Sequence, residues 1–123
     1  NAGMTFNTWP LMDGAIVPSG LFIQEPAWRN IFENVATVQF DHRAVAWLLA
    51  FTVPIAWWKA LRVGAAPARV RRGAHLLLAM LALQVALGIL TLLHVVPLPL
   101  AAAHQAGALV LFALALHLAH ALR

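Results

Sequence analysis

The sequence contains no cysteine and few charged side chains. Without Cys in its 123 residues, the chain cannot form a disulfide, a cysteine zinc site or an iron–sulfur cluster. A bound metal would therefore need His, Met or carboxylate ligands. Only 10% of the residues are charged, whereas 63% are hydrophobic, and the mean hydropathy is +0.82. This composition lies outside the range of soluble domains and indicates a membrane protein.

Carboxylates are also scarce, and within the apolar runs only Asp41, at the rim of the first run, is acidic. We therefore assign no catalytic acid or base in this chain. A cleavable signal peptide is not expected, because residues 1–34 lack a basic start followed by a short apolar core. The chain also opens without an initiator Met, so we expect it to be a piece of a longer protein.

The basic residues are concentrated in one region of the chain. Five of the eight Lys and Arg residues fall between Lys59 and Arg72, with apolar runs on both sides. A net charge of +4 alone would be compatible with nucleic-acid binding. Basic residues placed between two apolar runs are instead typical of a cytoplasmic loop in a membrane protein.

Three runs approach the ~20 apolar residues that a membrane-spanning helix needs. The positive-inside rule places the basic loop in the cytoplasm and the N-terminal segment outside, where we expect short interfacial helices, one of them over residues 27–40. In chain order we expect an outer loop over 1–39, a span over 40–62, a basic cytoplasmic loop over 63–72, a span over 73–96, a short outer loop over 97–99 and a span over 100–123. The predicted fold is an all-α, polytopic transmembrane helix bundle, and a fourth helix before Asn1 would complete a four-helix unit.

Six histidines are unusual in so apolar a chain, and ionisable groups inside a membrane usually mark function. His42, His94 and His104 fall in the outer half of the predicted bundle, one on each span. Two imidazoles on different helices at one level are what bis-His haem ligation requires. We predict His42 and His104 as that pair, binding the cofactor through its metal. For the remaining histidines we expect interfacial roles, or hydrogen bonding in the case of His94; these are His75, His94, His117 and His120.

Small residues near the predicted pair would let a flat macrocycle approach both helices, and we expect Ala46, Gly107 and Ala108 to do so. Gln84 with Gly88 one turn later predicts close helix packing with an interhelical hydrogen bond.

Three polar residues flank the two histidines in the sequence. Arg43 is expected to meet a haem propionate, and Asp41 and Gln105 to orient the imidazoles. The alternative for Asp41 and Arg43 is an ion pair at the membrane surface.

Three stretches carry a resemblance to a known family: NAGMTFNTWPLMDGAIVP, NIFENVATVQFDHR and VPLPLAAAHQAGALVL. In this order and spacing they resemble the C-terminal half of haem A synthase, in the version found in proteobacteria and mitochondria. The similarity covers essentially the whole chain. The family version with a pair of cysteines in an outer loop is excluded, because this sequence has no Cys.

The resemblance implies more than the spacing does. Haem A synthases have eight transmembrane helices in two pseudo-symmetric halves and oxidise the C8 methyl group of haem O to the formyl group of haem A for cytochrome c oxidase. In the C-terminal half the positions matching the haem b ligands are His42 and His104. The substrate haem and a catalytic carboxylate belong to the N-terminal half, so this piece alone is expected to be inactive. The family pattern does not lead us to expect His94.

The expected partners are haem, the N-terminal half of the same protein and the lipid bilayer; homo-oligomerisation stays open, and nucleic acid is not expected. The expected location is the bacterial cytoplasmic membrane rather than the mitochondrial inner membrane. Two other functions remain open from the residues alone. One is a membrane b-type cytochrome that transfers electrons without chemistry of its own, for which His75 with His117 or His120 would form a second pair. The other is a cofactor-free assembly or transport bundle.

Overall fold

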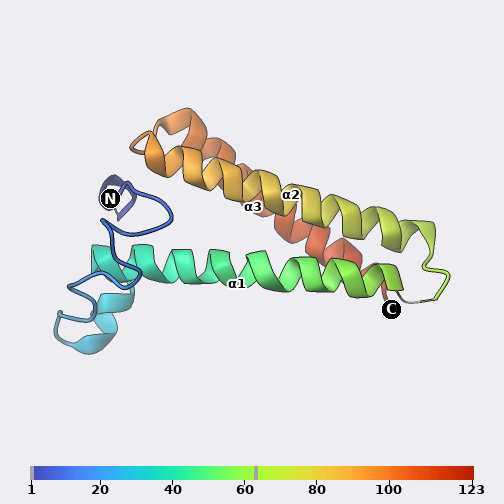
Figure 1. Cartoon of the computed structure of the whole chain (residues 1–123), viewed down its shortest axis with the longest axis horizontal. Coiled ribbons are helices and arrows are strands. Elements are labelled where there is room, and N and C mark those ends of the chain that lie inside the picture. The colour runs from blue at the N-terminus through green and yellow to red at the C-terminus, as the bar shows by residue number, and fades with distance from the viewer. Residues whose placement is uncertain (1, 63) are drawn as a thin grey trace.

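The computed structural model describes residues 2–62 and 64–123, which form three long helices and two short turns (Figure 1). The long helices are α1 (Val35–Arg62), α2 (Ala68–Leu93) and α3 (Leu98–Ala121), and the 3₁₀ turns η1 (Ala2–Met4) and η2 (Ala27–Ile31) precede them. The described ranges contain no strand. All three long helices have the length and apolar composition to cross a membrane. The predicted all-α fold with three spanning helices is therefore confirmed.

Helix α1 begins at Val35 rather than at residue 40, because Asn34 caps it. The Asn34 Oδ1 accepts a hydrogen bond from the backbone N–H of Thr37 at 3.1 Å, which satisfies a free amide of the first turn. The predicted interfacial helix over residues 27–40 is wrong, since η2 ends at Ile31 and a separate helix starts at Val35.

Helix α2 also starts before its expected position. It begins at Ala68, directly after Pro67, and not at residue 73. Proline suits the start of a helix, because its missing N–H would have no partner there. Arg69, Arg71 and Arg72 therefore lie in the first turns of α2 and not in a loop.

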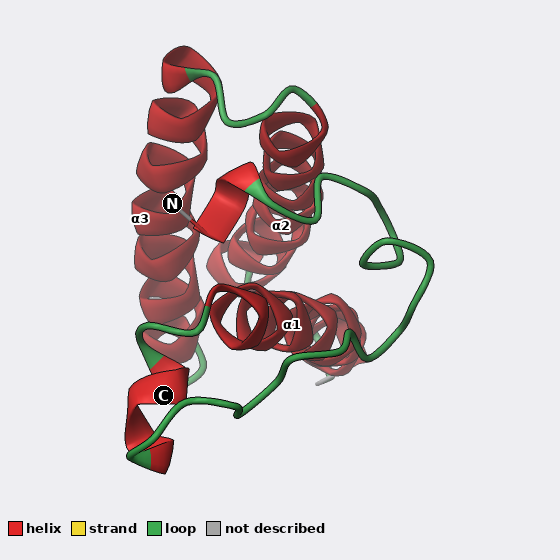
Figure 2. Ribbon diagram, turned by 90° about the vertical axis from the view of Figure 1, so that its left-hand side faces the viewer, coloured by secondary structure: helices red, strands yellow, loops and turns green. Residues whose placement is uncertain are grey.

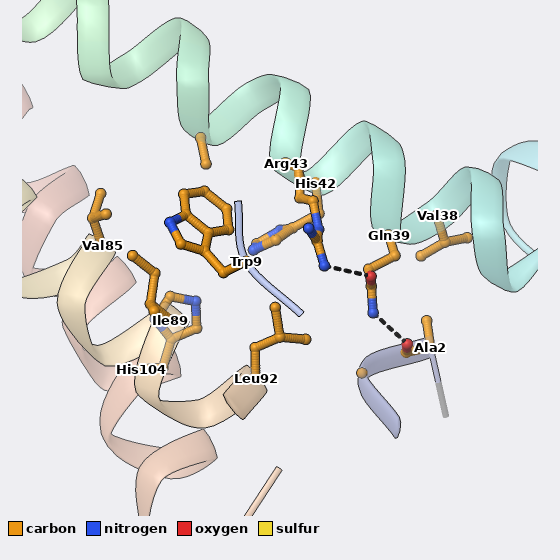
Figure 3. Close-up of a pocket in the computed structure, with 13 residues that line it drawn as sticks. Ala2, Trp9, Val38, Gln39, His42, Arg43, Val85, Ile89, Leu92 and His104 are labelled. Carbon is orange, nitrogen blue, oxygen red and sulfur yellow. Dashed lines mark hydrogen bonds between the residues drawn. The ribbon is translucent and has the colours of Figure 1, made fainter. Parts of the chain in front are cut away.

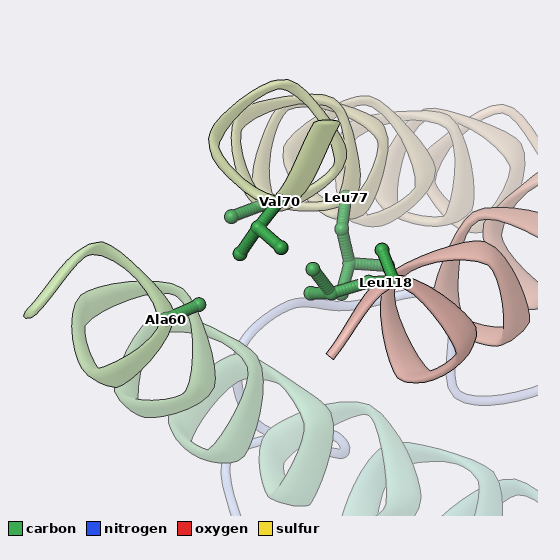
Figure 4. Close-up of a cluster of buried hydrophobic side chains, with 6 residues drawn as sticks. Ala60, Val70, Leu77 and Leu118 are labelled. Carbon is green, nitrogen blue, oxygen red and sulfur yellow. The ribbon is translucent and has the colours of Figure 1, made fainter. Parts of the chain in front are cut away.

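The helices pack most closely where α1 ends and α2 begins, which we call the basic end (right-hand side of Figure 1). Small and apolar side chains from all three helices meet there in one buried cluster (Figure 4). Ala74 at its centre is 0% exposed. Because lipid is as apolar as the side chains themselves, helix association in membranes depends on such close contact. The buried members of the cluster are Ala60, Val70, Ala74, Leu77, Leu118 and Ala121.

The opposite end, which we call the histidine end, is where α1 starts and α2 connects to α3. Residues 2–34, the N-terminal segment, lie beside the start of α1 there, and Figure 2 shows their loops in front of the helices. Side-chain amides hold this segment in place. Asn30 is 0% exposed, and its amide both donates to the Gln24 carbonyl at 2.8 Å and accepts from the Gln24 N–H at 2.8 Å. Polar contacts thus fix the internal fold of this segment.

The N-terminal segment also reaches α2. The Asn7 amide donates to the carbonyl of Leu92 at 2.9 Å, near the end of α2. Gly3 lies against Val96 in the turn before α3, so closely that a Cβ at Gly3 would stand 2.8 Å from the Val96 Cγ2. The segment therefore bridges the ends of α1 and α2 beside the two histidines.

Candidate functional site

The structure brings the imidazoles of His42 and His104 side by side. Their ring centres are 6.1 Å apart, and the ring planes are inclined by 77°. His42 comes from the second turn of α1 and His104 from the second turn of α3, so two helices that otherwise make little contact meet at these side chains. Figure 3 shows both rings in their surroundings. Their proximity agrees with the predicted pair, whereas ligation itself stays a prediction.

Two cavities adjoin the pair. The first, the loop-side cavity, has a volume of about 270 Å³ and is lined in part by Trp9 of the N-terminal segment. The second, the bundle cavity, has a volume of about 370 Å³ and extends between the three helices. His42, His104, Ala46 and Val85 line both cavities, so the imidazoles lie at their junction. The bundle cavity lies at the low end of the ~300–1,000 Å³ that small-molecule sites occupy, and the loop-side cavity lies just below that range.

A glycine on α2 makes room for the His104 ring. A Cβ at Gly88 would stand 2.8 Å from the His104 Cε1, closer than such atoms approach, so only glycine fits without moving the ring. The Nδ1 of His104 is buried and has no hydrogen-bond partner among the described residues. Because buried polar atoms normally have a partner, the unpaired Nδ1 shows that the described residues leave part of the hydrogen-bonding capacity of His104 unused.

Gln84 fixes the backbone of α3 at the same level. Its amide donates to the carbonyl of His104 at 2.7 Å, which confirms the predicted interhelical hydrogen bond. The expected role of Gly107, however, is wrong. Gly107 faces α2, where a Cβ would collide with the Gln84 Oε1, so it serves helix packing and does not open the cavity. Ala108 does line the bundle cavity.

Arg43 is buried beside the pair and holds the N-terminal segment, as Figure 3 shows in part. We expected this guanidinium to meet a haem propionate. In the structure both of its terminal nitrogens donate to oxygens of the protein, at 2.8 to 3.2 Å. The acceptors are the backbone carbonyls of Phe6, Thr8, Pro10 and Leu11 and the side chain of Gln39. Arg43 therefore acts as a clamp on the chain.

Asp41 and Gln105 do not take the roles expected of them. Within residues 2–62 and 64–123, neither side chain makes a hydrogen bond to an imidazole, and Asp41 forms no ion pair with Arg43. The ion pair found in this part of the chain joins Arg29 and Glu33, at 2.9 Å on the surface.

Trp9 is a site residue that the sequence alone did not reveal. It lines the loop-side cavity, stacks on Trp47 of α1 with ring centres 5.5 Å apart, and lies 5.7 Å from the Arg43 guanidinium carbon. The position of a loop residue cannot be predicted from helical periodicity. The only sequence signal for Trp9 was that it lies in one of the stretches that resemble the family.

The remaining histidines lie apart from the two cavities. His94 is exposed, and its Nδ1 bonds to the carbonyl of Leu90 at 2.9 Å at the end of α2, which confirms its hydrogen-bonding role. His75, His117 and His120 are exposed on α2 and α3 toward the basic end. Across the described chain, no three His, Cys, Asp or Glu residues are grouped to hold a metal ion by themselves. Two imidazoles alone suit a cofactor that brings its own metal and equatorial ligands.

Comparison with known proteins agrees with the resemblance. The model of the family COX15-CtaA, cytochrome oxidase assembly protein, matches residues 1–116. A haem A synthase of Nitrosospira multiformis is 57% identical over 122 residues, covering 99% of this chain and 34% of that protein. Haem A synthases of Nitrosomonas eutropha and Parvibaculum lavamentivorans are 53% and 50% identical, covering 94% and 98% of this chain and 32% and 34% of those proteins.

The chain thus spans about a third of the length of the curated relatives it matches. No solved structure matches it. The three apolar helices, together with these relatives, make the chain part of a multi-pass membrane protein.

Proposed function

Since this chain belongs to the cytochrome oxidase assembly protein family, we propose that it is the haem-binding C-terminal part of a haem A synthase, in which His42 and His104 ligate a haem b. The observation that carries this proposal is the pair of imidazoles from two helices, 6.1 Å apart at the junction of two cavities.

The residues present fit the cofactor in three respects. The imidazoles of His42 and His104 come from two different helices and lie within 6.1 Å of each other, ring centre to ring centre, as two ligands of one metal would have to. The unpaired Nδ1 of His104 leaves that imidazole free to act as a ligand. Gly88 gives the same ring a cradle on α2. The protein thereby supplies position, ligands and an apolar surround, which is its usual share in a haem protein.

A haem held by His42 and His104 would supply one-electron transfer at this site. The residues around the pair orient and shield it. Gln84 holds the carbonyl of His104, and Val85, Ala46 and Trp9 give the pair an apolar surround. The Arg43 clamp keeps the N-terminal segment over the site.

The chemistry of the family reaction has to come from elsewhere in the protein. From His42 to Arg123 the sequence has no Asp or Glu, so Asp41, near the start of α1, is the only carboxylate in the three helices, and within the described residues it makes no hydrogen bond to either imidazole. We assign the oxidation of the C8 methyl group of haem O to the N-terminal half and electron transfer to this part. We place the histidine end on the outer side of the bacterial cytoplasmic membrane and the basic end in the cytoplasm, following the positive-inside rule.

The test is the reduced absorption spectrum of the full-length protein, measured for the wild type and for single histidine variants. His42→Ala and His104→Ala should each abolish the b-type bands of this half. His94→Ala is the matched control, because it removes an exposed imidazole of the same end and should leave the bands unchanged. Retention of the bands in both His42→Ala and His104→Ala would overturn the ligand assignment.

Two further measurements separate this proposal from its rivals. One haem b for each copy of this segment agrees with the proposal, whereas two would favour a membrane b-type cytochrome with a second pair at the basic end. A product assay for haem A then tests the reaction. Failure of His42→Ala and His104→Ala to reduce haem A formation would argue against a part for this segment in the reaction.

A further inference from the structure

A third cavity lies at the basic end, far from the histidine pair. Its volume is about 630 Å³, and it is lined by the end of α1, the connecting loop and the first turns of α2. The lining residues are Leu61, Gly64, Ala65, Ala66, Arg71 and His75. We call it the basic cavity. Neither the predicted haem site nor the family reaction makes use of it.

Two basic side chains face this cavity from the same side of α2. Arg71 and His75 are four residues apart, which places them one above the other on one helix face. Arg71 presents a permanently charged, planar fork of donors that matches two oxygens of a phosphate. The positive end of α2 is adjacent, because Arg71 lies in the first turn after Ala68.

Trp57 of α1 sets the proton position on His75. The indole N–H donates to the His75 Nδ1 at 3.1 Å, and the two ring centres are 6.1 Å apart. Nδ1 therefore acts as the acceptor, and a neutral ring must carry its hydrogen on Nε2. His75 is left with an N–H donor, the group that an anionic oxygen would accept from.

The local charge is positive and has no acidic counterpart in the sequence. The sequence around the lining residues contains four more basic side chains, Lys59, Arg62, Arg69 and Arg72. No Asp or Glu follows Asp41. Arg62 lies over the Trp58 ring with its guanidinium carbon 4.0 Å from the ring centre. Tryptophans at the ends of spanning helices mark the level of lipid headgroups. The cavity thus lies at a depth where phosphate-bearing anions are abundant.

We propose that the basic cavity binds a phosphate-bearing anion, held by the Arg71 guanidinium and the Nε2–H of His75, with an anionic phospholipid headgroup or free phosphate as its source. The positive-inside rule accounts for basic residues at this end in general. It does not account for two donors that share a cavity, one of them fixed in its tautomer by an indole N–H.

The experiment uses the full-length protein, purified in a neutral detergent and titrated with phosphatidylglycerol in mixed micelles, with phosphatidylcholine as the uncharged reference. Native mass spectrometry counts the retained lipids. Arg71→Gln should weaken phosphatidylglycerol binding by about tenfold, the effect of losing one charge-assisted bidentate contact. Arg69→Gln and Arg72→Gln are matched controls, because each removes the same charge from an exposed position outside the cavity, and each should change binding less than twofold.

Two more variants test the geometry without removing the charge. Arg71→Lys keeps the charge and loses the planar fork, so binding should fall by less than in Arg71→Gln. Trp57→Phe keeps an aromatic ring and loses the indole donor, so binding should fall a few-fold because His75 no longer has a fixed tautomer. The haem absorption of each variant checks that the fold is intact.

A competition with inorganic phosphate at constant ionic strength distinguishes the two sources. Displacement of the lipid by millimolar phosphate, but not by chloride, identifies free phosphate as a ligand of the cavity, whereas retention of the lipid identifies the headgroup. Equal losses in the Arg69, Arg71 and Arg72 variants would reduce the effect to surface charge and overturn the proposal. Absence of both lipid retention and phosphate binding in the wild type would overturn it as well.

Discussion

The two ends of the helix bundle are held together in different ways. At the basic end α1, α2 and α3 touch directly through small and apolar side chains (Figure 4). Ala74 is fully buried there. At the histidine end α1 meets α3 mainly through two imidazoles, and cavities occupy the space between the helices. Close packing at one end thus anchors the helices so that they can stand apart at the other.

At the histidine end, side-chain hydrogen bonds hold the structure where the helices are not closely packed. Arg43, Asn30 and Asn34 direct their donors to backbone carbonyls of the N-terminal segment, and Gln39 joins Arg43 to the carbonyl of Ala2. Hydrogen bonds fix direction as well as distance, whereas apolar contacts do not. Clamps therefore define the open site at the histidine end, whereas packing stabilises the basic end.

The largest effect is expected from breaking the clamp at the histidine end. Arg43→Ala removes hydrogen bonds to four backbone carbonyls and to Gln39, and should destabilise docking of the N-terminal segment by at least about 3 kcal/mol. Limited proteolysis and hydrogen exchange of residues 2–34 measure this loss. Arg72→Ala, at the exposed surface of the basic end, is the control and should leave protection unchanged. Unchanged protection in Arg43→Ala would contradict the clamp.

Truncating a buried side chain at the basic end should lower the stability of the protein without changing haem binding. Leu118 is 4% exposed, so Leu118→Ala should lower the free energy of unfolding by about 2–3 kcal/mol. Leu109→Ala on the same helix is the control, because that side chain is 73% exposed and its loss should cost less than about 0.5 kcal/mol. Unfolding in detergent gives both values. Loss of the haem bands from still-folded Leu118→Ala would show that the ends are not independent.

Two glycines on α2 allow the same substitution to be compared at each end. Gly88→Ala introduces a Cβ 2.8 Å from the His104 ring, and should cost about 1–2 kcal/mol and shift the haem bands or the midpoint potential. At Gly73 the nearest atom is the His117 Cδ2 at 3.4 Å, an ordinary contact, so Gly73→Ala should change neither property. Spectra and redox titrations of both variants decide the matter. Equal spectra in the two variants would show that Gly88 does not shape the haem site.

The smallest effect is expected at His94. His94→Ala removes one exposed bond to the Leu90 carbonyl, and should change stability by less than about 0.5 kcal/mol and leave the haem bands intact. Thermal unfolding monitored by the haem absorbance measures both. A large loss of haem would place His94 nearer the cofactor than the structure does.

Composition was sufficient to predict the three spanning helices, because runs of about 20 apolar residues have few other solutions. The bond from Gln84 to α3 was also predictable, since a buried amide in a membrane needs a partner. The rotation of each helix about its axis was not. The roles expected for Gly88 and Gly107 were therefore exchanged: Gly88 lies against the His104 ring, and Gly107 against Gln84.

The partners of Arg43 could not be found from local sequence either. They lie 32 to 37 residues earlier in a segment without regular structure, so no periodicity links them to α1. The start of α1 was missed as well: we expected the span from residue 40, although Asn34 is a favourable N-cap residue and its Oδ1 accepts from the Thr37 N–H.

The bond from the Asn7 amide to the Leu92 carbonyl has a bearing on the order of assembly. With Gly3 seated on Val96, it ties residues 2–7 across the gap between α1 and α2, where Ala2 and Gly3 line the loop-side cavity. The loop-side cavity is therefore complete only once α2 has joined α1, because part of its lining is tied to the end of α2.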